Sequence, residues 1–231
     1  TLAANQNDSN AQFNLGVIYL KGIYVMKDIN KGILYIKLAA NQGNPKAQSN
    51  LGLMYAFGDG IEQDYAKAVE YYEKAAEQND PDAQLNLGLM YDQGEGVEVD
   101  KAKAAELYSK SADSGNVKAM FNLAYLLHKG EPGVIEKDNK KAVELYTKAS
   151  KKGLAQAQYN LGVLYLKGDD DIPINKKKAA ELFEKASKQG NCDAQLNLGF
   201  MYSKGDGVQV NMKKAIKLYK QAASQNNAKA Q

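Results

Sequence analysis

Ala83–Gly94, with the sequence AQLNLGLMYDQG, returns along the whole chain in near-identical form. Five further copies of this block begin at Ala11, Ala47, Ala119, Ala157 and Ala194, and a seventh stops after two residues, at Ala230–Gln231. Successive copies start 36, 36, 36, 38, 37 and 36 residues apart. A period of this length is typical of stacked helical hairpins, because a single hairpin cannot bury its apolar face alone. We therefore predict an all-α solenoid.

Each repeat is predicted to hold two helices, here named A and B. The residue three before the block alanine is the predicted N-cap of helix A, because an Asp or Asn side chain there accepts a hydrogen bond from a free backbone N–H. The residues at this position are Asp8, Asn44, Asp80, Asn116, Leu154, Asn191 and Asn227. Six of the seven are Asp or Asn, and Leu154 predicts a weaker helix start. A glycine is the predicted end of every helix A, and Gly or Asn of every helix B, since both tolerate left-handed backbone.

The repeats predict one continuous domain over residues 1–231, with a core that runs along its length. Its repeats are about 8–43, 44–79, 80–115, 116–153, 154–190 and 191–226, with partial repeats at 1–7 and 227–231. Residues 1–6 resemble the end of a helix B. Because the chain starts at Thr1 and in mid-repeat, we expect it to be a segment of a longer protein.

All variation in repeat length falls between helix A and helix B. The distance from the predicted helix B cap to the next block alanine is always 19 residues, for example from Asp100 to Ala119. The extra residues lie around Glu131–Gly133 and Asp169–Pro173. We expect these loops to lie along one edge of the solenoid, where insertions do not disturb the stacking.

Composition excludes several classes of function. The net charge is +3, and all 30 basic residues are lysine, so the chain has no guanidinium group for bidentate contacts to bases or phosphates. No apolar run approaches the ~18 residues of a membrane span. The single cysteine, Cys192, cannot form an internal disulfide, which slightly favours a reducing compartment. We expect neither nucleic-acid binding nor membrane insertion.

Residues with catalytic or metal-binding chemistry are scarce. His128 is the only histidine, so neither a histidine-pair metal site nor a Ser-His-Asp triad can form. Cys192 lies near a predicted helix start, where a thiol pKa can fall, but a structural cysteine is the simpler interpretation. Asp169–Asp171 lacks the twelve-residue calcium-loop pattern and is interpreted as a solvated loop. We predict no enzyme activity, no cofactor and no metal.

Helix A divides into two faces when its positions are numbered from the block alanine at ~100° per residue. Positions one, five, eight and nine are predicted to be core, and the glycine at position six should let a neighbouring helix approach closely. Positions three, seven and ten form a second stripe that varies between copies but stays largely apolar. Such variation beside an unvaried core favours a binding surface, although packing of helix A on helix A would also explain the stripe.

The pattern Ala-x-x-Asn-Leu-Gly-x-x-Tyr-x-x-Gly-x-Gly-Val-x-x-Asp-x-x-Lys-Ala resembles the Sel-1-like repeat, a relative of the tetratricopeptide repeat. The second repeat carries it at Leu51-Gly52, Tyr55, Gly58, Gly60, Asp64 and Ala68. The first repeat departs with Gly32 for the helix B alanine, and the fourth with Ala124 and Leu127 for Gly and Tyr. The resemblance implies a right-handed α/α superhelix that acts as an adaptor, with the variable stripe on its concave face.

We predict a non-enzymatic scaffold that binds a protein or an extended peptide in the concave groove. One rival is a cell-wall or β-lactam-binding hydrolase, as in the cysteine-rich branch of the family, whose paired cysteines this chain lacks. The other is a self-associating array, because open repeat ends expose stacking surfaces.

The predicted site lies in repeats four to six. Phe121, Tyr125 and His128 are spaced i, i+4, i+7 and should share one helix face, and Tyr159 and Phe200 should extend it. Asn occurs at position four of every copy, where its amide could hold a peptide backbone or instead bond the adjacent repeat. The site residues of this last kind are Asn122, Asn160 and Asn197. The competing explanation for Phe121 and Tyr125 is that they fill the space left by Ala124 and Leu127.

Overall fold

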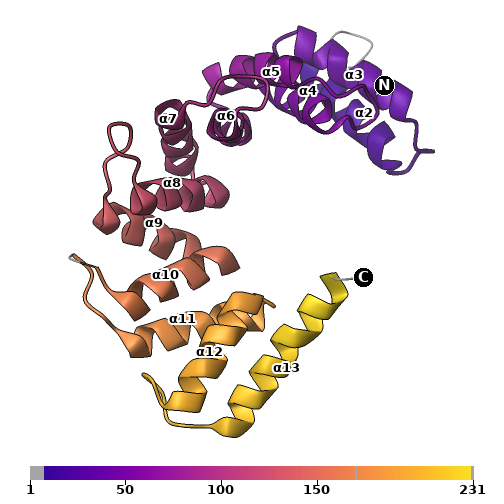
Figure 1. Cartoon of the computed structure of the whole chain (residues 1–231). Coiled ribbons are helices and arrows are strands. Elements are labelled where there is room, and N and C mark those ends of the chain that lie inside the picture. The colour runs from indigo at the N-terminus through magenta and orange to yellow at the C-terminus, as the bar shows by residue number, and fades with distance from the viewer. Residues whose placement is uncertain (1–7, 170, 230–231) are drawn as a thin grey trace. The chain divides into compact units, whose positions relative to one another are not determined.

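The computed structural model describes residues 8–169 and 171–229, which form twelve helices in six A–B pairs (Figure 1). The A helices are α2 (Ser9–Lys21), α4 (Pro45–Phe57), α6 (Pro81–Gln93), α8 (Val117–Lys129), α10 (Ala155–Lys167) and α12 (Cys192–Lys204). The B helices are α3 (Ile29–Asn41), α5 (Tyr65–Glu77), α7 (Lys101–Asp113), α9 (Asn139–Lys151), α11 (Lys176–Lys188) and α13 (Met212–Lys229). Over the described ranges there is no strand, which confirms the all-α prediction; the predicted helical remnant at residues 1–6 lies outside them.

The chain divides into two compact units, one ending at Asn116 and the other beginning at Val117. The first unit holds α2–α7 and the second α8–α13, so each contains three repeats. Within each unit every helix packs against the next one along the chain. This is the arrangement in which each helical hairpin gains its core from its neighbour. That residues 1–231 form a single continuous domain stays a prediction.

Side-chain caps start the helices where the sequence predicts them. The carboxylates of Asp80 and Asp100, for example, accept hydrogen bonds from the backbone N–H of Ala83 at 2.8 Å and of Lys103 at 2.8 Å. Helix α10 starts at Leu154 without a side-chain cap, as expected for the one copy that lacks Asp or Asn. Each missing cap removes a partner for an N–H at the helix start.

The predicted end of α13 at Asn226 and new start at Asn227 are wrong, because α13 continues to Lys229. At the equivalent point Asn79 does turn left-handed, with φ of +62°, and ends α5. There the chain continues into Asp80-Pro81, which commits the backbone to a turn and a new helix. Asn tolerates both conformations, and Asn226 is followed by Asn-Ala, which imposes no turn.

Close contact between helices A and B explains the glycine at position six. A Cβ built on Gly88 would lie 2.7 Å from Cε1 of Tyr108, a side chain with no exposed surface. The aromatic ring of helix B thus rests directly on the backbone of helix A. Gly52 and Gly162 have the same relation to Tyr72 and Phe183.

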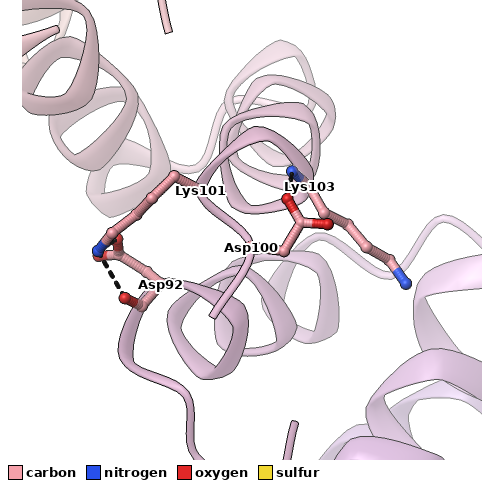
Figure 2. Close-up of polar contacts among 4 residues, drawn as sticks. All are labelled: Asp92, Asp100, Lys101 and Lys103. Atoms are coloured by element: carbon pink, nitrogen blue, oxygen red, sulfur yellow. Dashed lines mark hydrogen bonds and ion pairs between the residues drawn. The ribbon is translucent and has the colours of Figure 1, made fainter. Parts of the chain in front are cut away.

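The A–B connection of the third repeat shows how the two helices are joined (Figure 2). Lys101, the first residue of α7, donates from its ammonium to Asp92 near the end of α6, both at the carboxylate and, at 2.6 Å, at the carbonyl oxygen. Asp100 caps α7 alongside, as Figure 2 shows. The longer loops of repeats four and five instead each close an antiparallel bridge, Glu131 with Ile135 and Asp169 with Ile172.

A ladder of buried glutamines joins the repeats, and the sequence pattern gave no sign of it. Position two of helix A is Gln in five copies, with 2–5% of each residue exposed. Gln48 accepts a hydrogen bond from Gln78 at 2.8 Å, at the end of helix B in the same repeat, and donates to the carbonyl of Ala40 in the preceding repeat at 3.3 Å. Because buried amides need partners, this pairing fixes how one hairpin sits on the next.

The third repeat breaks this ladder, which yields a stability prediction. Ser114 stands where four other copies have Gln42, Gln78, Gln189 or Gln225, and the buried Oε1 of Gln84 has no hydrogen-bond partner. Ser114→Gln should supply the missing N–H and raise the free energy of unfolding by about 1 kcal/mol. Ser114→Met has a similar length and no donor, so it should give no such gain. Equal chemical denaturation midpoints for the two variants would contradict the prediction.

Candidate partner-binding face

Three of the four core positions predicted for helix A are buried in the second unit. Positions one, five and eight of α10, for example, are Ala157, Leu161 and Leu164, with 0%, 2% and 4% of each residue exposed. The same positions of α8 and α12 are also buried. Position nine is less buried, since Tyr165 and Tyr202 lie at the edge of the core cluster. These buried positions form the interior of this unit, and stripe residues such as Tyr159, Val163 and Leu166 pack against it while only partly buried.

Position three of the stripe packs on aromatic side chains of helix B. The ring of Phe121 lies 5.7 Å from that of Tyr146, and the ring of Tyr159 lies 5.8 Å from that of Phe183. Both Phe121 and Tyr159 are half-buried. Tilted ring pairs at this separation are favourable. These two residues therefore support the core with one side and offer the other side to solvent.

Position seven is the most exposed part of the stripe. Tyr125 is 47% exposed and Phe200 is 54% exposed, whereas Val163 between them in sequence order packs partly against the core. About half of each of these two side chains therefore takes no part in filling the interior. The competing explanation for Tyr125 was that it fills the space left by Ala124 and Leu127. That explanation does not account for the half of its side chain that is exposed.

In repeats five and six the asparagine at position four contacts a tyrosine of the preceding repeat, whereas Asn50 in repeat two donates to the carbonyl of Lys46 in its own helix. Nδ2 of Asn160 donates to the hydroxyl of Tyr146 at 3.2 Å, and Nδ2 of Asn197 lies 3.5 Å from the hydroxyl of Tyr159. Burial raises the pKa of Tyr146 to about 12, so its hydroxyl stays protonated at neutral pH. Nδ2 of each amide is used in this way, and its Oδ1 is a further acceptor. Asn122 is half-buried at the same position of α8.

His128 belongs to the edge of the A–B loops. Its Nδ1 lies 2.9 Å from Oδ1 of Asn139, and Nδ2 of Asn139 donates to Oδ2 of Asp169 at 2.7 Å. Because Oδ1 of Asn139 is then the acceptor, Nδ1 of His128 carries the proton. Lys137 also donates to Asp169, at 2.7 Å. His128 thus joins a polar network between repeats four and five, which the spacing of Phe121, Tyr125 and His128 did not indicate.

Position eleven completes the exposed face and was missed by the sequence analysis. In the second unit this position is lysine in all three repeats, Lys129, Lys167 and Lys204, and all three are exposed. Positions four, seven and eleven fall within an arc of about 60° at ~100° per residue. We name these residues of α8, α10 and α12 the A face of the second unit. The i, i+4 spacing of Phe200 and Lys204 was the signal that could have revealed it.

The first unit has an A face of different character. Leu53 is 41% exposed at position seven and Phe57 is 75% exposed at position eleven. Phe57 is a further exposed aromatic that the stripe of positions three, seven and ten had left out. Asp92, at position ten, is held by Lys101.

Two structural features limit the chemistry of the described residues. Over the ranges 8–169 and 171–229, no three His, Cys, Asp or Glu side chains gather in a way that could hold a metal ion. Within the same ranges, every helix is too short or too polar to cross a membrane.

The repeats found by comparison with known proteins each begin and end one residue after the repeats predicted from the sequence. The Sel1 repeat model matches residues 9–44, 45–80, 81–116, 117–154, 155–191 and 192–227. The chain is 34% identical to c5321, a protective antigen of uropathogenic Escherichia coli with an SLR fold, with a TM-score of 0.92. That match covers 99% of this chain and 48% of the antigen, so the chain spans about half of its length.

A Sel1 repeat protein from Oxalobacter formigenes is 32% identical over 94% of this chain and 86% of its own, with a TM-score of 0.82. Immunity protein Pa5087 from Pseudomonas aeruginosa is similar in fold, at 22% identity over 94% of this chain and 81% of its own, with a TM-score of 0.53. Among curated proteins there is no match.

Proposed function

The chain belongs to the Sel1 repeat family, and from that premise we propose that it is an adaptor that binds a segment of a partner protein on the A face of its second unit. Proteins of this family are typically protein-interaction scaffolds, and the fold is generally non-catalytic. The family suggests the role of a scaffold, whereas the A face as the binding surface and a chain segment as the ligand are what we propose here.

The exposure of Tyr125 and Phe200 is the observation that supports the proposal most directly. Aromatic side chains dominate the energy of protein interfaces, because they bury a large area and lose few rotamers. Here two of them are about half exposed on a unit whose interior is already filled. Phe121 and Tyr159 are half-buried against Tyr146 and Phe183 of helix B, so their rings are held in place and can support a bound ligand.

An extended segment suits this face better than a globular surface does. The acceptor oxygens of Asn160 and Asn197 recur once per repeat, as do the aromatic and aliphatic groups at position seven. Side-chain acceptors and apolar contacts that repeat in this way match the backbone N–H groups and alternating side chains of an extended chain. Segment ordering on binding costs free energy, so we expect moderate affinity.

Site-specific photo-cross-linking tests where the partner binds. p-Benzoylphenylalanine placed at Phe200 or at Tyr125 should form the same protein adduct in cells that express the natural protein. The matched control places it at Lys177, an exposed residue on α11. An adduct that forms equally at all three positions, or only at Lys177, would contradict the proposed face.

Removal of the two aromatics should weaken binding without unfolding the chain. Tyr125→Ala combined with Phe200→Ala should raise the Kd for the cross-linked partner by about 30-fold for each of the two residues, given hot-spot values of ~2 kcal/mol per residue. The free energy of unfolding should change by less than about 1 kcal/mol, because both side chains are half exposed. Phe57→Ala, which removes an exposed aromatic of the first unit, is the control and should leave the Kd unchanged. A large fall in melting temperature with an unchanged Kd would make Tyr125 and Phe200 core residues.

A further inference from the structure

The two units of the chain carry opposite charge. The sequence up to Asn116 has 10 lysines and 16 acidic residues, a formal charge of −6, whereas the sequence from Val117 has 20 lysines and 11 acidic residues, a formal charge of +9. The overall value of +3 conceals this difference. A charge of this size on one unit raises the local concentration of an oppositely charged partner and accelerates its association.

Part of this positive charge lies on the A face itself. Lys129, Lys167 and Lys204 are exposed, and each lies four residues after the position-seven side chain of its helix. Their ammonium groups belong to none of the ion pairs formed among the described residues. Three lysines in equivalent places therefore form a row beside Tyr125 and Phe200.

The acidic residues nearest in sequence to two of these lysines have other partners. Asp169, two residues after Lys167, accepts from Lys137 and Asn139 at 2.7 Å each. Asp206, two residues after Lys204, lies 2.7 Å from Nζ of Lys176. Both carboxylates are held at the start of a helix B in the preceding repeat. This leaves the ammonium groups of Lys167 and Lys204 to an external anion.

Interaction with the helix dipole is one structural reason for lysine at position eleven, but it does not by itself explain why lysine occurs there. Each of these lysines stands in the last turn of its helix, where a cation interacts favourably with the helix dipole. The first unit has Lys21 at this position of α2 but Phe57 and Gln93 at it in α4 and α6, and these two helices still form and end at the equivalent glycine. The fold therefore does not require lysine at position eleven.

We propose that the A face of the second unit selects an acidic segment of a partner protein. Its carboxylates pair with Lys129, Lys167 and Lys204, and an apolar side chain of the segment contacts Tyr125 or Phe200. This proposal rests on the proposed function and adds the chemistry of the partner to it. A protein segment is favoured over a nucleic acid because the face combines aliphatic and aromatic groups with lysine, and the chain has no arginine for bidentate phosphate contacts.

Selection from a random library of twelve-residue peptides, displayed on mRNA and captured by the intact chain, tests the proposal. Enriched peptides should contain several Asp or Glu residues and at least one large apolar residue. The best peptide should bind more weakly as NaCl rises from 50 to 300 mM, because salt screens exposed charges. Enrichment of basic or uncharged peptides would overturn the acidic specificity and leave the proposed function intact. Failure to enrich any peptide would count against both.

Matched charge variants locate the contact. The triple variant Lys129→Gln, Lys167→Gln, Lys204→Gln should raise the Kd of the best peptide by about tenfold, the expected sum of three exposed ion pairs. The control triple variant Lys151→Gln, Lys177→Gln, Lys185→Gln removes the same charge from exposed residues of α9 and α11 and should change the Kd by less than about twofold. Equal losses in the two variants would show a general effect of net charge and overturn the site. Tighter binding of a twelve-residue oligo-dT, measured in parallel, would assign the face to nucleic acid instead.

Discussion

Phe183→Ala is expected to lower the free energy of unfolding by about 3–5 kcal/mol, the usual cost of removing a large buried ring. Phe183 has no exposed surface and lies against the backbone of α10, where a Cβ on Gly162 would come within 2.7 Å of its Cε1. Gly162 has no side chain that could fill the space that the ring leaves. The substitution also removes the ring on which Tyr159 rests.

A conservative variant separates loss of the ring from other effects. Four of the other copies have tyrosine at this position and the first has Ile36, and Tyr146 bonds Asn160 through its hydroxyl. Phe183→Tyr should therefore keep the packing and cost less than about 1 kcal/mol. Chemical denaturation of both variants measures the difference. If Phe183→Ala costs no more than Phe183→Tyr, the ring does not form the core of the second unit.

Gly88→Leu is expected to lower the free energy of unfolding by about 2–3 kcal/mol, because it overpacks a filled interface. A Cβ at this position would meet Cε1 and Cδ1 of Tyr108 at 2.7 and 2.8 Å. Tyr108 is fully buried, so its ring has no free volume to move into. Relief would require α6 and α7 to separate, which would expose the core of the third repeat. A denaturation midpoint equal to that of the unmodified chain would exclude the close contact.

Gly96→Ala tests a loop glycine that is also part of the repeat interface. Alanine at Gly96 should cost more than ~1 kcal/mol if the backbone there has a positive φ, because a side chain is strained in that conformation. The φ of Gly96 is +73°, and a Cβ would lie 2.6 Å from the carbonyl carbon and oxygen of Tyr65 in the preceding repeat. Gly115→Ala is the matched control, since Gly115 has φ of +91° and open space around it. Gly96→Ala should cost more than Gly115→Ala, and equal costs would mean that backbone strain alone matters.

The sequence by itself determined the elements and most of their ends. The period fixed the number of helices, and the Asp and Asn caps fixed their starts, because capping depends on residues only three apart in the chain. Leu154 is a further example. The sequence places no Asp or Asn at the start of α10, and in the structure this helix has no side-chain cap. The core positions followed from the 3.6-residue period. The prediction that α13 ends at Asn226 and that a new helix starts at Asn227 was wrong, because asparagine permits two backbone conformations and no neighbouring residue here selects between them.

Only the tertiary structure decided what each helix face touches. A helical period gives the direction of a side chain from its own axis but not what occupies that direction. Gln84 and its equivalents are polar and were not assigned to the core, yet the ends of two B helices bury them. Phe121 and Tyr125 share a stripe, but a ring of α9 covers one and leaves the other exposed. His128 is bonded to Asn139 because the A–B loop turns back, and a contact of that kind depends on the packing of two helices rather than on the pattern of one.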